Sequence, residues 1–164
     1  MRLAMALIVD CYNVLHVSMP PVLAGLDEGR LCEALSRSPW AESPITVVAD
    51  GRPKPLRASE SPAAGVELIF AGSHRSADEL IIQQIRHDSA PRRLTVVSSD
   101  REIRAAARRR RARDLSSEDF VEKLARYVQR RGIPRPVSAR PAVDPLPPEL
   151  VQRWKRAFGF RPHD

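Results

Sequence analysis

Three runs that are typical of buried strands end on an aspartate or lead to one. Asp10 follows ALIV, Asp50 follows TVVA and Asp100 follows TVVSS. In an open parallel sheet, ligands bind beyond the carboxyl ends of the strands. Because neighbouring strands lie about 4.8 Å apart, acids at these ends would lie close to one another. We therefore expect Asp10, Asp50 and Asp100 to share one edge of a sheet.

A fourth acid, Asp78, stands in the first turn of a helix that is expected over residues 77–87. Carboxylates gathered in one place repel each other unless a cation neutralises them. Hard oxygen ligands without histidine or cysteine suit Mg²⁺ or Mn²⁺. We expect Asp10, Asp78 and Asp100 to be the metal ligands, and such an ion can position a water as a nucleophile on a phosphate. Glu79 is an alternative to Asp78 as a ligand. Adjacent helical residues point about 100° apart, so the two are not expected to bind the same ion together.

Each of these acids also has a purely structural interpretation. Aspartate is common after a strand because it favours turns and caps. Asp100 could simply cap the following helix, and Asp78 could simply complement a helix dipole. The strand before Asp50 is expected to lie farther from the centre of the sheet. The joint placement of the acids on several strand ends is what favours a shared site over separate caps.

The elements that would position these acids alternate between strands and helices. Apolar runs predict strands, and apolar residues at helical spacing predict helices. The expected strands are residues 3–9, 45–49, 66–71, 94–98 and 112–115, and the expected helices are 23–38, 77–87, 101–110 and 117–131. Loops are expected over residues 12–21 and 51–65, and Ser76 with Glu79 has the spacing of a capping box. This order predicts a three-layer α/β domain with a central, mostly parallel sheet of about five strands.

The domain is expected to span residues 1–131. The stretch at 132–148, GIPRPVSARPAVDPLPP, predicts an extended linker, and a helical tail is expected at 149–164. With 164 residues, 43% of them hydrophobic, the chain can form one core. No apolar run approaches the roughly 20 residues that span a bilayer, and the first residues lack a signal-peptide pattern. We therefore expect a cytoplasmic protein without membrane contact, with Cys11 and Cys32 as reduced thiols.

The net charge of +7 favours a polyanionic partner, and nucleic acid before membrane. The basic residues that are expected to contact RNA are Arg101, Arg104 and Arg108 on one helix, and Arg52 and Lys54 on a loop; Ser99 is a further candidate for phosphate. Two plainer interpretations stay open. The arginines could form a solvated helix face, and their excess over lysine could reflect genome composition. Trp40 could stack on a base or pack in the core.

Several stretches resemble the YacP-like branch of the NYN domains, which belong to the PIN-like nuclease superfamily. LIVDCYNVLH at residues 7–16 is similar to the opening motif, and GVELIF, SADELI, TVVSSDREIRAAA and DLSSEDFVEKL follow in order up to about residue 130. The resemblance implies a metal-dependent endoribonuclease with site residues Asp10, Asn13, Asp50, Asp78 and Asp100. It also implies RNA as the partner, messenger RNA on the ribosome as a context, and products with 5′-phosphate and 3′-hydroxyl ends. Asn13 would contact a phosphate or orient Asp10, or serve only as a turn residue.

The expected function is therefore divalent-metal-dependent cleavage of RNA. A catalytically silent RNA-binding or ribosome-docking module with the same fold is the main alternative. A phosphatase of the haloacid dehalogenase type ranks lower, because Tyr12 stands where that class needs a second acid. A toxin-like nuclease held by an antitoxin is a third possibility. Cys11 departs from the family pattern, which usually has glycine there, and the sequence leaves the RNA target, the number of metal ions and the oligomeric state open.

Overall fold

A computed structural model describes residues 5–53 and 65–131 of the chain. Its strands are β1 (Ala6–Asp10), β2 (Ile45–Ala49), β3 (Val66–Phe70), β4 (Leu94–Val97) and β5 (Arg113–Leu115). Its α-helices are α1 (Cys11–Leu15), α2 (Glu28–Ser36), α3 (Ala77–His87), α4 (Arg101–Arg109) and α5 (Ser117–Arg131), and its 3₁₀ helices are η1 (Pro21–Leu23), η2 (Pro39–Glu42) and η3 (Pro91–Arg93). The predicted linker, the predicted tail and Lys54 lie outside the described residues.

The five strands form one sheet in the order β3-β2-β1-β4-β5, and every pair of neighbouring strands is parallel. β1 is the central strand. Val9 lies opposite Val47 of β2 and Val97 of β4, so the carboxyl ends of these three strands are level. The chain winds outward in both directions from β1, which makes the carboxyl end of β1 the place where open α/β sheets bind ligands.

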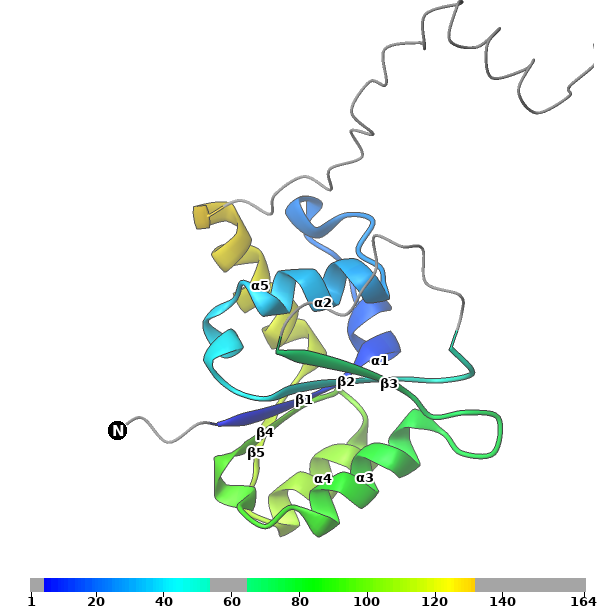
Figure 1. Ribbon diagram of the computed structural model, residues 1–164. Helices are drawn as coiled ribbons and strands as arrows, with labels where there is room; N and C mark the ends of the chain where they lie inside the picture. Colours follow the sequence, from blue (N-terminus) through cyan, green and yellow to red (C-terminus); the bar gives the residue numbers. More distant parts are fainter. Residues whose placement is uncertain (1–4, 54–64, 132–164) are drawn as a thin grey trace, which may run out of the picture. The chain divides into compact units, whose positions relative to one another are not determined.

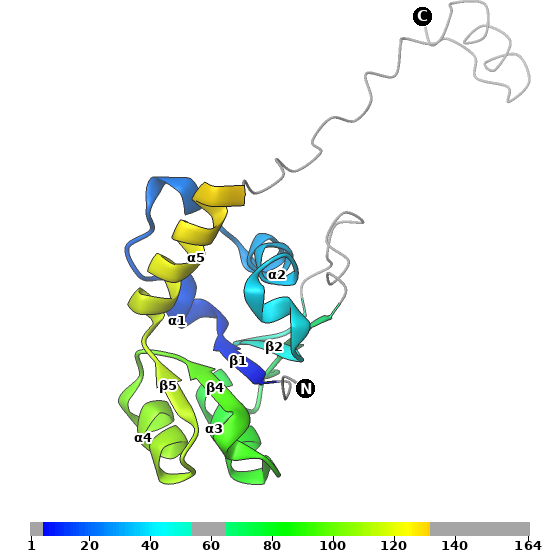
Figure 2. The same ribbon diagram turned by 90° about the vertical axis from the view of Figure 1, so that its left-hand side faces the viewer.

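Helices cover both faces of the sheet, with α1, α2 and α5 on one face and α3 and α4 on the other (Figure 1). The view in Figure 2 shows the same separation from the side. Along β1, Leu7 and Val9 pack in the core under α1, α2 and α5, while Ile8 packs in the core under α3 and α4. This alternation is the period of two that a strand imposes. The three-layer α/β prediction is confirmed.

The loop predicted over residues 12–21 is wrong in its first part, because the short helix α1 begins directly after Asp10 and ends at Leu15. The Asp10 side chain caps this helix by accepting a hydrogen bond from the Asn13 backbone N–H at 3.4 Å, and Cys11 and Val14 anchor the helix in the core. A helix of five residues shows too little periodicity to be recognised in a sequence, and tertiary packing stabilises it.

The helix predicted over residues 23–38 is also wrong in its first part. The chain forms η1, turns at Gly25 with φ of +73°, and begins α2 only at Glu28. Asp27 is the N-cap, since its carboxylate accepts a hydrogen bond from the Arg30 backbone N–H at 2.8 Å. A glycine in the left-handed region is incompatible with a continuous helix.

The remaining elements follow the sequence pattern to within one or two residues at their ends, except that β1 begins at Ala6, three residues after the predicted start. The capping box at the start of α3 is confirmed: Ser76 Oγ accepts from the Glu79 N–H at 3.2 Å, and the Ser76 N–H donates to Glu79 Oε2 at 3.3 Å. Among the described helices, none has the length and apolar character needed to cross a bilayer.

The packing of α3 against the sheet predicts a strong difference between two adjacent isoleucines. Ile81 is fully buried between α3 and the sheet, whereas Ile82 is only partly buried. Ile81→Ala is expected to lower the free energy of unfolding by about 2–5 kcal/mol, because it leaves a cavity. Ile82→Ala is expected to cost about 1 kcal/mol. Urea unfolding followed by circular dichroism measures both, and equal losses would contradict the described orientation of α3.

Candidate active site

The alternation of side chains brings three polar residues to one face at the carboxyl edge. Ile8, Val48 and Val96 all pack toward α3 and α4. Asp10, Asp50 and Ser98 each come two residues later, so they continue on this same face. The first turns of α3 and α4 meet these residues, because Ala77 and Asp100 both hydrogen-bond to them. The candidate site therefore lies between two helix N-termini and the end of the central strand.

Asp10 is the buried member of this group, with 4% of its surface exposed. Its Oδ2 accepts a hydrogen bond from Ser98 Oγ at 2.8 Å. The pKa of Asp10 is raised to about 6. Burial is the main cause, the hydrogen bonds from Ser98 and Asn13 act against it, and the charges of Asp78 and Asp50 add smaller contributions that raise the pKa. Carboxyl groups whose pKa is raised by burial and by neighbouring acids are concentrated at functional sites, which makes Asp10 a candidate for such a site.

Asp100 and Asp10 are bridged by one hydroxyl group. Ser98 Oγ donates to Asp10 and accepts from the Asp100 backbone N–H at 3.1 Å. Asp100 is also the N-cap of α4, with Oδ1 accepting from the backbone N–H groups of Glu102 at 2.8 Å and Ile103 at 3.1 Å. Asp100 therefore caps α4, as the structural interpretation predicts, and it also lies beside Asp10.

Asp50 and Asp78 are the other two acids of the candidate site. Asp50 Oδ1 accepts a hydrogen bond from the Ala77 backbone N–H at 2.7 Å. The expectation that the strand of Asp50 lies far from the centre is wrong, since β2 is the direct neighbour of β1. Partial burial and then the charges of Asp100 and Asp50 raise the pKa of Asp78. Glu79 is engaged in the capping box, so Asp78 is the α3 acid that is exposed to these charges.

No described lysine, arginine or histidine makes a salt bridge to any of these four aspartates. Within residues 5–53 and 65–131, no three His, Cys, Asp or Glu side chains lie close enough together to hold a metal ion among themselves. The donor chemistry is nevertheless that of Mg²⁺ or Mn²⁺, because it consists of carboxylate oxygens. Magnesium keeps several waters and commonly takes only one or two carboxylates plus substrate phosphate. The residues present fit such an ion.

Asn13 links three elements around the site. Its Oδ1 accepts hydrogen bonds from the Ser99 backbone N–H at 2.9 Å and from Ser117 Oγ at 2.6 Å. Ser99 Oγ in turn accepts from the Ser117 N–H at 3.0 Å and donates to Glu118. The Asn13 carbonyl and the Ser99 hydroxyl therefore hold α1, the β4–α4 turn and α5 together. A contact of either residue with phosphate stays a prediction.

Sequence reasoning missed the parts played by Ser98 and Ser117, which are both fully buried. A signal was present, because a serine pair stands directly after each of two strands, at 98–99 after β4 and at 116–117 after β5. Since β4 and β5 are neighbours, the two pairs meet at the same edge. Tyr12 of the opening motif serves the fold: its hydroxyl donates to Glu28 Oε1 at 2.7 Å, and this bond raises the pKa of Tyr12 to about 12.

The basic residues that were predicted to contact RNA have different surroundings in the structure. Arg104 Nε and Arg108 Nη2 each lie 2.9 Å from Asp114 Oδ2 of β5, and these partners lower the pKa of Asp114. These two arginines thus attach α4 to β5. Arg52 donates to Ser73 Oγ at 3.3 Å, and Arg101 is exposed. Their binding to RNA stays a prediction.

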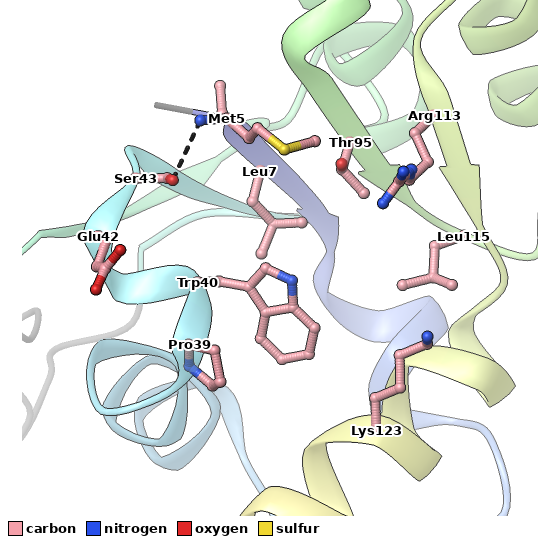
Figure 3. A pocket seen from close by; sticks show the side chains of 11 residues that line it. Met5, Leu7, Pro39, Trp40, Glu42, Ser43, Thr95, Arg113, Leu115 and Lys123 are labelled. Atoms are coloured by element: carbon pink, nitrogen blue, oxygen red, sulfur yellow. Dashed lines mark hydrogen bonds between the residues drawn. The ribbon is translucent and has the colours of Figure 1, made fainter. Parts of the chain in front are cut away.

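One cavity among the described residues lies away from the acids. It has a volume of about 570 Å³ and opens near the amino end of β1, beside Met5 and Leu7 (Figure 3). Trp40 lines it, with Arg113 and Lys123 on the opposite side. The Trp40 ring packs against Phe120 with 5.1 Å between ring centroids, which supports the core interpretation of this tryptophan. We therefore assign the candidate site from its acidic residues and not from the volume of a cavity.

Comparison with known proteins identifies the family of this chain. The family model of the YacP-like NYN domain matches residues 7–156. The chain belongs to this family. Membership of the YacP-like NYN family indicates a nuclease-type, RNA-related function.

Two solved structures share the fold of this NYN domain. One is Rae1 (YacP) from Bacillus subtilis, at 20% sequence identity and a TM-score of 0.51, with 94% of this chain and 87% of that chain covered. The other is a mutant of the same Bacillus subtilis protein, at 18% identity and a TM-score of 0.53, with 96% and 86% covered. A comparison with curated proteins finds no match.

The raised pKa of Asp10 predicts how stability depends on pH in metal-free buffer. The folded state holds the Asp10 proton more tightly than the unfolded chain does, so ionisation between about pH 4 and pH 6 lowers stability. A shift from 3.8 to about 6 corresponds to about 3 kcal/mol. Asp10→Asn is therefore expected to unfold at higher urea concentration than the wild type at pH 7.5, and to flatten the pH dependence in that window.

Asp114→Asn is the matched control with the opposite sign. The pKa of Asp114 is lowered by Arg108 and Arg104, so its stabilising contribution is present at neutral pH and is lost as pH falls through its folded pKa. This variant is expected to be less stable than the wild type at pH 7.5. An Asp10→Asn protein that is also destabilised at this pH would contradict the described environment of Asp10.

Proposed function

We propose that this NYN domain is a divalent-metal-dependent endoribonuclease that hydrolyses RNA phosphodiester bonds at the carboxyl edge of its sheet. Family membership supplies the nuclease-type, RNA-related function. The observation that supports the finer statement is the buried, uncompensated carboxylate of Asp10 at the end of the central strand, close enough to Asp50 and Asp78 for their charges to raise its pKa. Such a group is suited to a hard cation and a phosphate.

The ligands in this proposal are Asp10, Asp78 and Asp100. Asp10 would hold the ion directly, while Asp78 and Asp100 would hold it directly or through water, as Mg²⁺ and Mn²⁺ sites permit. When bound, the ion would activate a water molecule and stabilise negative charge on the scissile phosphate. Attack of a water on phosphorus, with loss of its proton to solvent and departure of the 3′ oxygen, which takes up a proton from solvent, would leave the 5′-phosphate and 3′-hydroxyl ends that the family resemblance implies.

The chain's own groups prepare this edge for an anionic substrate. Ser98 fixes the orientation of the Asp10 carboxylate and joins it to the first turn of α4. Asp50 fixes the start of α3 through the Ala77 N–H. Both helices thereby direct their N-termini, which carry partial positive charge, at the place where a phosphate would lie. Asn13 holds the surrounding turns in position.

The context of the reaction belongs to the same proposal. Messenger RNA on the ribosome as the substrate, and a cytoplasmic location, rest on the family resemblance and on the net charge of +7. The alternative is a catalytically silent RNA-binding or ribosome-docking module. It is favoured by one observation, namely that no three potential ligands among the described residues are grouped tightly enough to hold an ion by themselves.

Cleavage of a labelled RNA separates the two functions. Wild-type protein with Mg²⁺ or Mn²⁺ is expected to cleave it, and EDTA is expected to stop cleavage. Asp10→Asn and Asp100→Asn are each expected to reduce the rate by at least about 10²-fold, because each removes charge from the metal site. RNA affinity in EDTA is expected to stay nearly unchanged in both variants.

Glu122→Gln is the control, because Glu122 is exposed on α5 and its carboxylate pairs with Arg126 on the same helix. This variant is expected to cleave at the wild-type rate. RNA ends are sequenced after each reaction. Identical cleavage patterns and rates from wild-type and Asp100→Asn protein would count against the assigned site, and absence of cleavage by the wild type would favour the silent module.

A further inference from the structure

The arginines of α4 fall into two groups with different surroundings. Arg104 and Arg108 are paired with Asp114 of β5. Arg101 and Arg109 instead line a groove of about 330 Å³ between α4 and α3. The other residues that line it are Ile82, Arg86, Glu102, Ala105 and Ala106. One side of the helix is thus neutralised within the fold, and the other is not.

A second hollow lies at the amino edge of the sheet and shares one lining residue with the groove. Arg109 lines both. The second hollow has a volume of about 560 Å³ and lies between η3 and the end of α4, where Ser89, Ala90, Pro91, Arg92, Arg93, Arg110 and Arg111 complete its lining. No acidic side chain and no aromatic ring lines it. We call the two hollows together the arginine track.

The charges of the arginine track are uncompensated within the described part of the chain. Its arginines are Arg86, Arg92, Arg93, Arg101, Arg109, Arg110 and Arg111; all are exposed, and none makes a salt bridge to a described residue. Arg110 only donates to the backbone carbonyl of Asp88, at 2.8 Å. Glu102 is the one acid that lines the track. Like charges held this close together repel each other, and a bound polyanion would relieve that repulsion.

One arginine occupies a position that favours glycine. Arg111 has φ of +60° directly after the C-cap of α4, in the left-handed region where helices usually end on glycine. A side chain there costs on the order of 1 kcal/mol. The chain nevertheless has an arginine at this turn, on the wall of the second hollow.

We propose that the arginine track binds the phosphates of single-stranded RNA that leads to or from the acidic edge. The track begins at Glu102, whose backbone N–H donates to Asp100 Oδ1 at 2.8 Å, so it starts beside the candidate site. It then follows α4 for nine residues, or roughly 13 Å. Since no aromatic ring lines the track, it contacts the backbone and not the bases. This inference deepens the proposed function, because it assigns a path to the substrate of that site.

Binding of RNA without metal tests the track independently of cleavage. The full chain is titrated in EDTA with a fluorescein-labelled polyuridine of about 30 nucleotides, and anisotropy is measured at several salt concentrations. The triple variant Arg92→Gln, Arg93→Gln, Arg109→Gln is expected to raise Kd at least tenfold at low salt. It is also expected to lower the salt slope by about 2, because each phosphate contact of a single strand contributes about 0.7.

The control removes the same charge from the opposite layer, with Arg37→Gln, Arg126→Gln and Arg130→Gln on the side of α2 and α5. It is expected to change Kd less than threefold. Equal losses in both triple variants, or no loss in the track variant, would overturn the proposal. Should the track variant not fold, Arg92→Gln alone is expected to lower the slope by about 0.7. Loss of binding in the track variant, together with a wild type that never cleaves RNA, would support the track and overturn the endoribonuclease proposal.

Discussion

Mutual repulsion between carboxylates at the carboxyl edge of the sheet is the constraint on which the rest of this structure depends. Asp10 is removed from water at the end of the central strand, and Asp50 and Asp78 add to the cost of its ionisation. The fold limits this cost with two devices. Ser98 donates to Asp10, and the N-termini of α3 and α4 face the acids with partial positive charge. In our proposal, a divalent cation neutralises the remaining negative charge of the acids and allows a phosphate to bind there.

Acids and arginines are both arranged along α4. The acids of the candidate site lie at the N-terminus of this helix, and the arginine track extends from Arg101 in its first turn to its C-terminus. The acids, and the arginines of the last turn, each match the local helix dipole, since acids are stabilised at N-termini and bases at C-termini. The same helix therefore explains why the two kinds of charge can coexist in one small domain, and it gives RNA an attractive surface next to a site that would otherwise repel it.

Local signals made much of this structure predictable. Apolar runs that end on Asp10, Asp50 and Asp100 indicated parallel strands with acids at one edge, and the capping-box spacing placed α3. The sequence did not indicate which strands are neighbours, so the bridge from Asp10 through Ser98 to Asp100 was not foreseen, nor was the link from Asn13 to Ser117. Arg104 and Arg108 were expected to contact RNA. Their ion pairs with Asp114 were not foreseen, because Asp114 comes from a separate strand. Such long-range pairings depend on the topology and leave no mark in local spacing.

The central claim is that acids from separate elements converge on one hard cation, and the position of a bound metal tests it most directly. Crystals of the full chain soaked with Mn²⁺ would reveal the ion through its anomalous scattering. The account predicts a manganese peak within coordination distance of the Asp10 carboxylate, on the side that faces the first turns of α3 and α4. Manganese bound only elsewhere on the chain, with the Asp10 carboxylate in contact with protein and water alone, would contradict it.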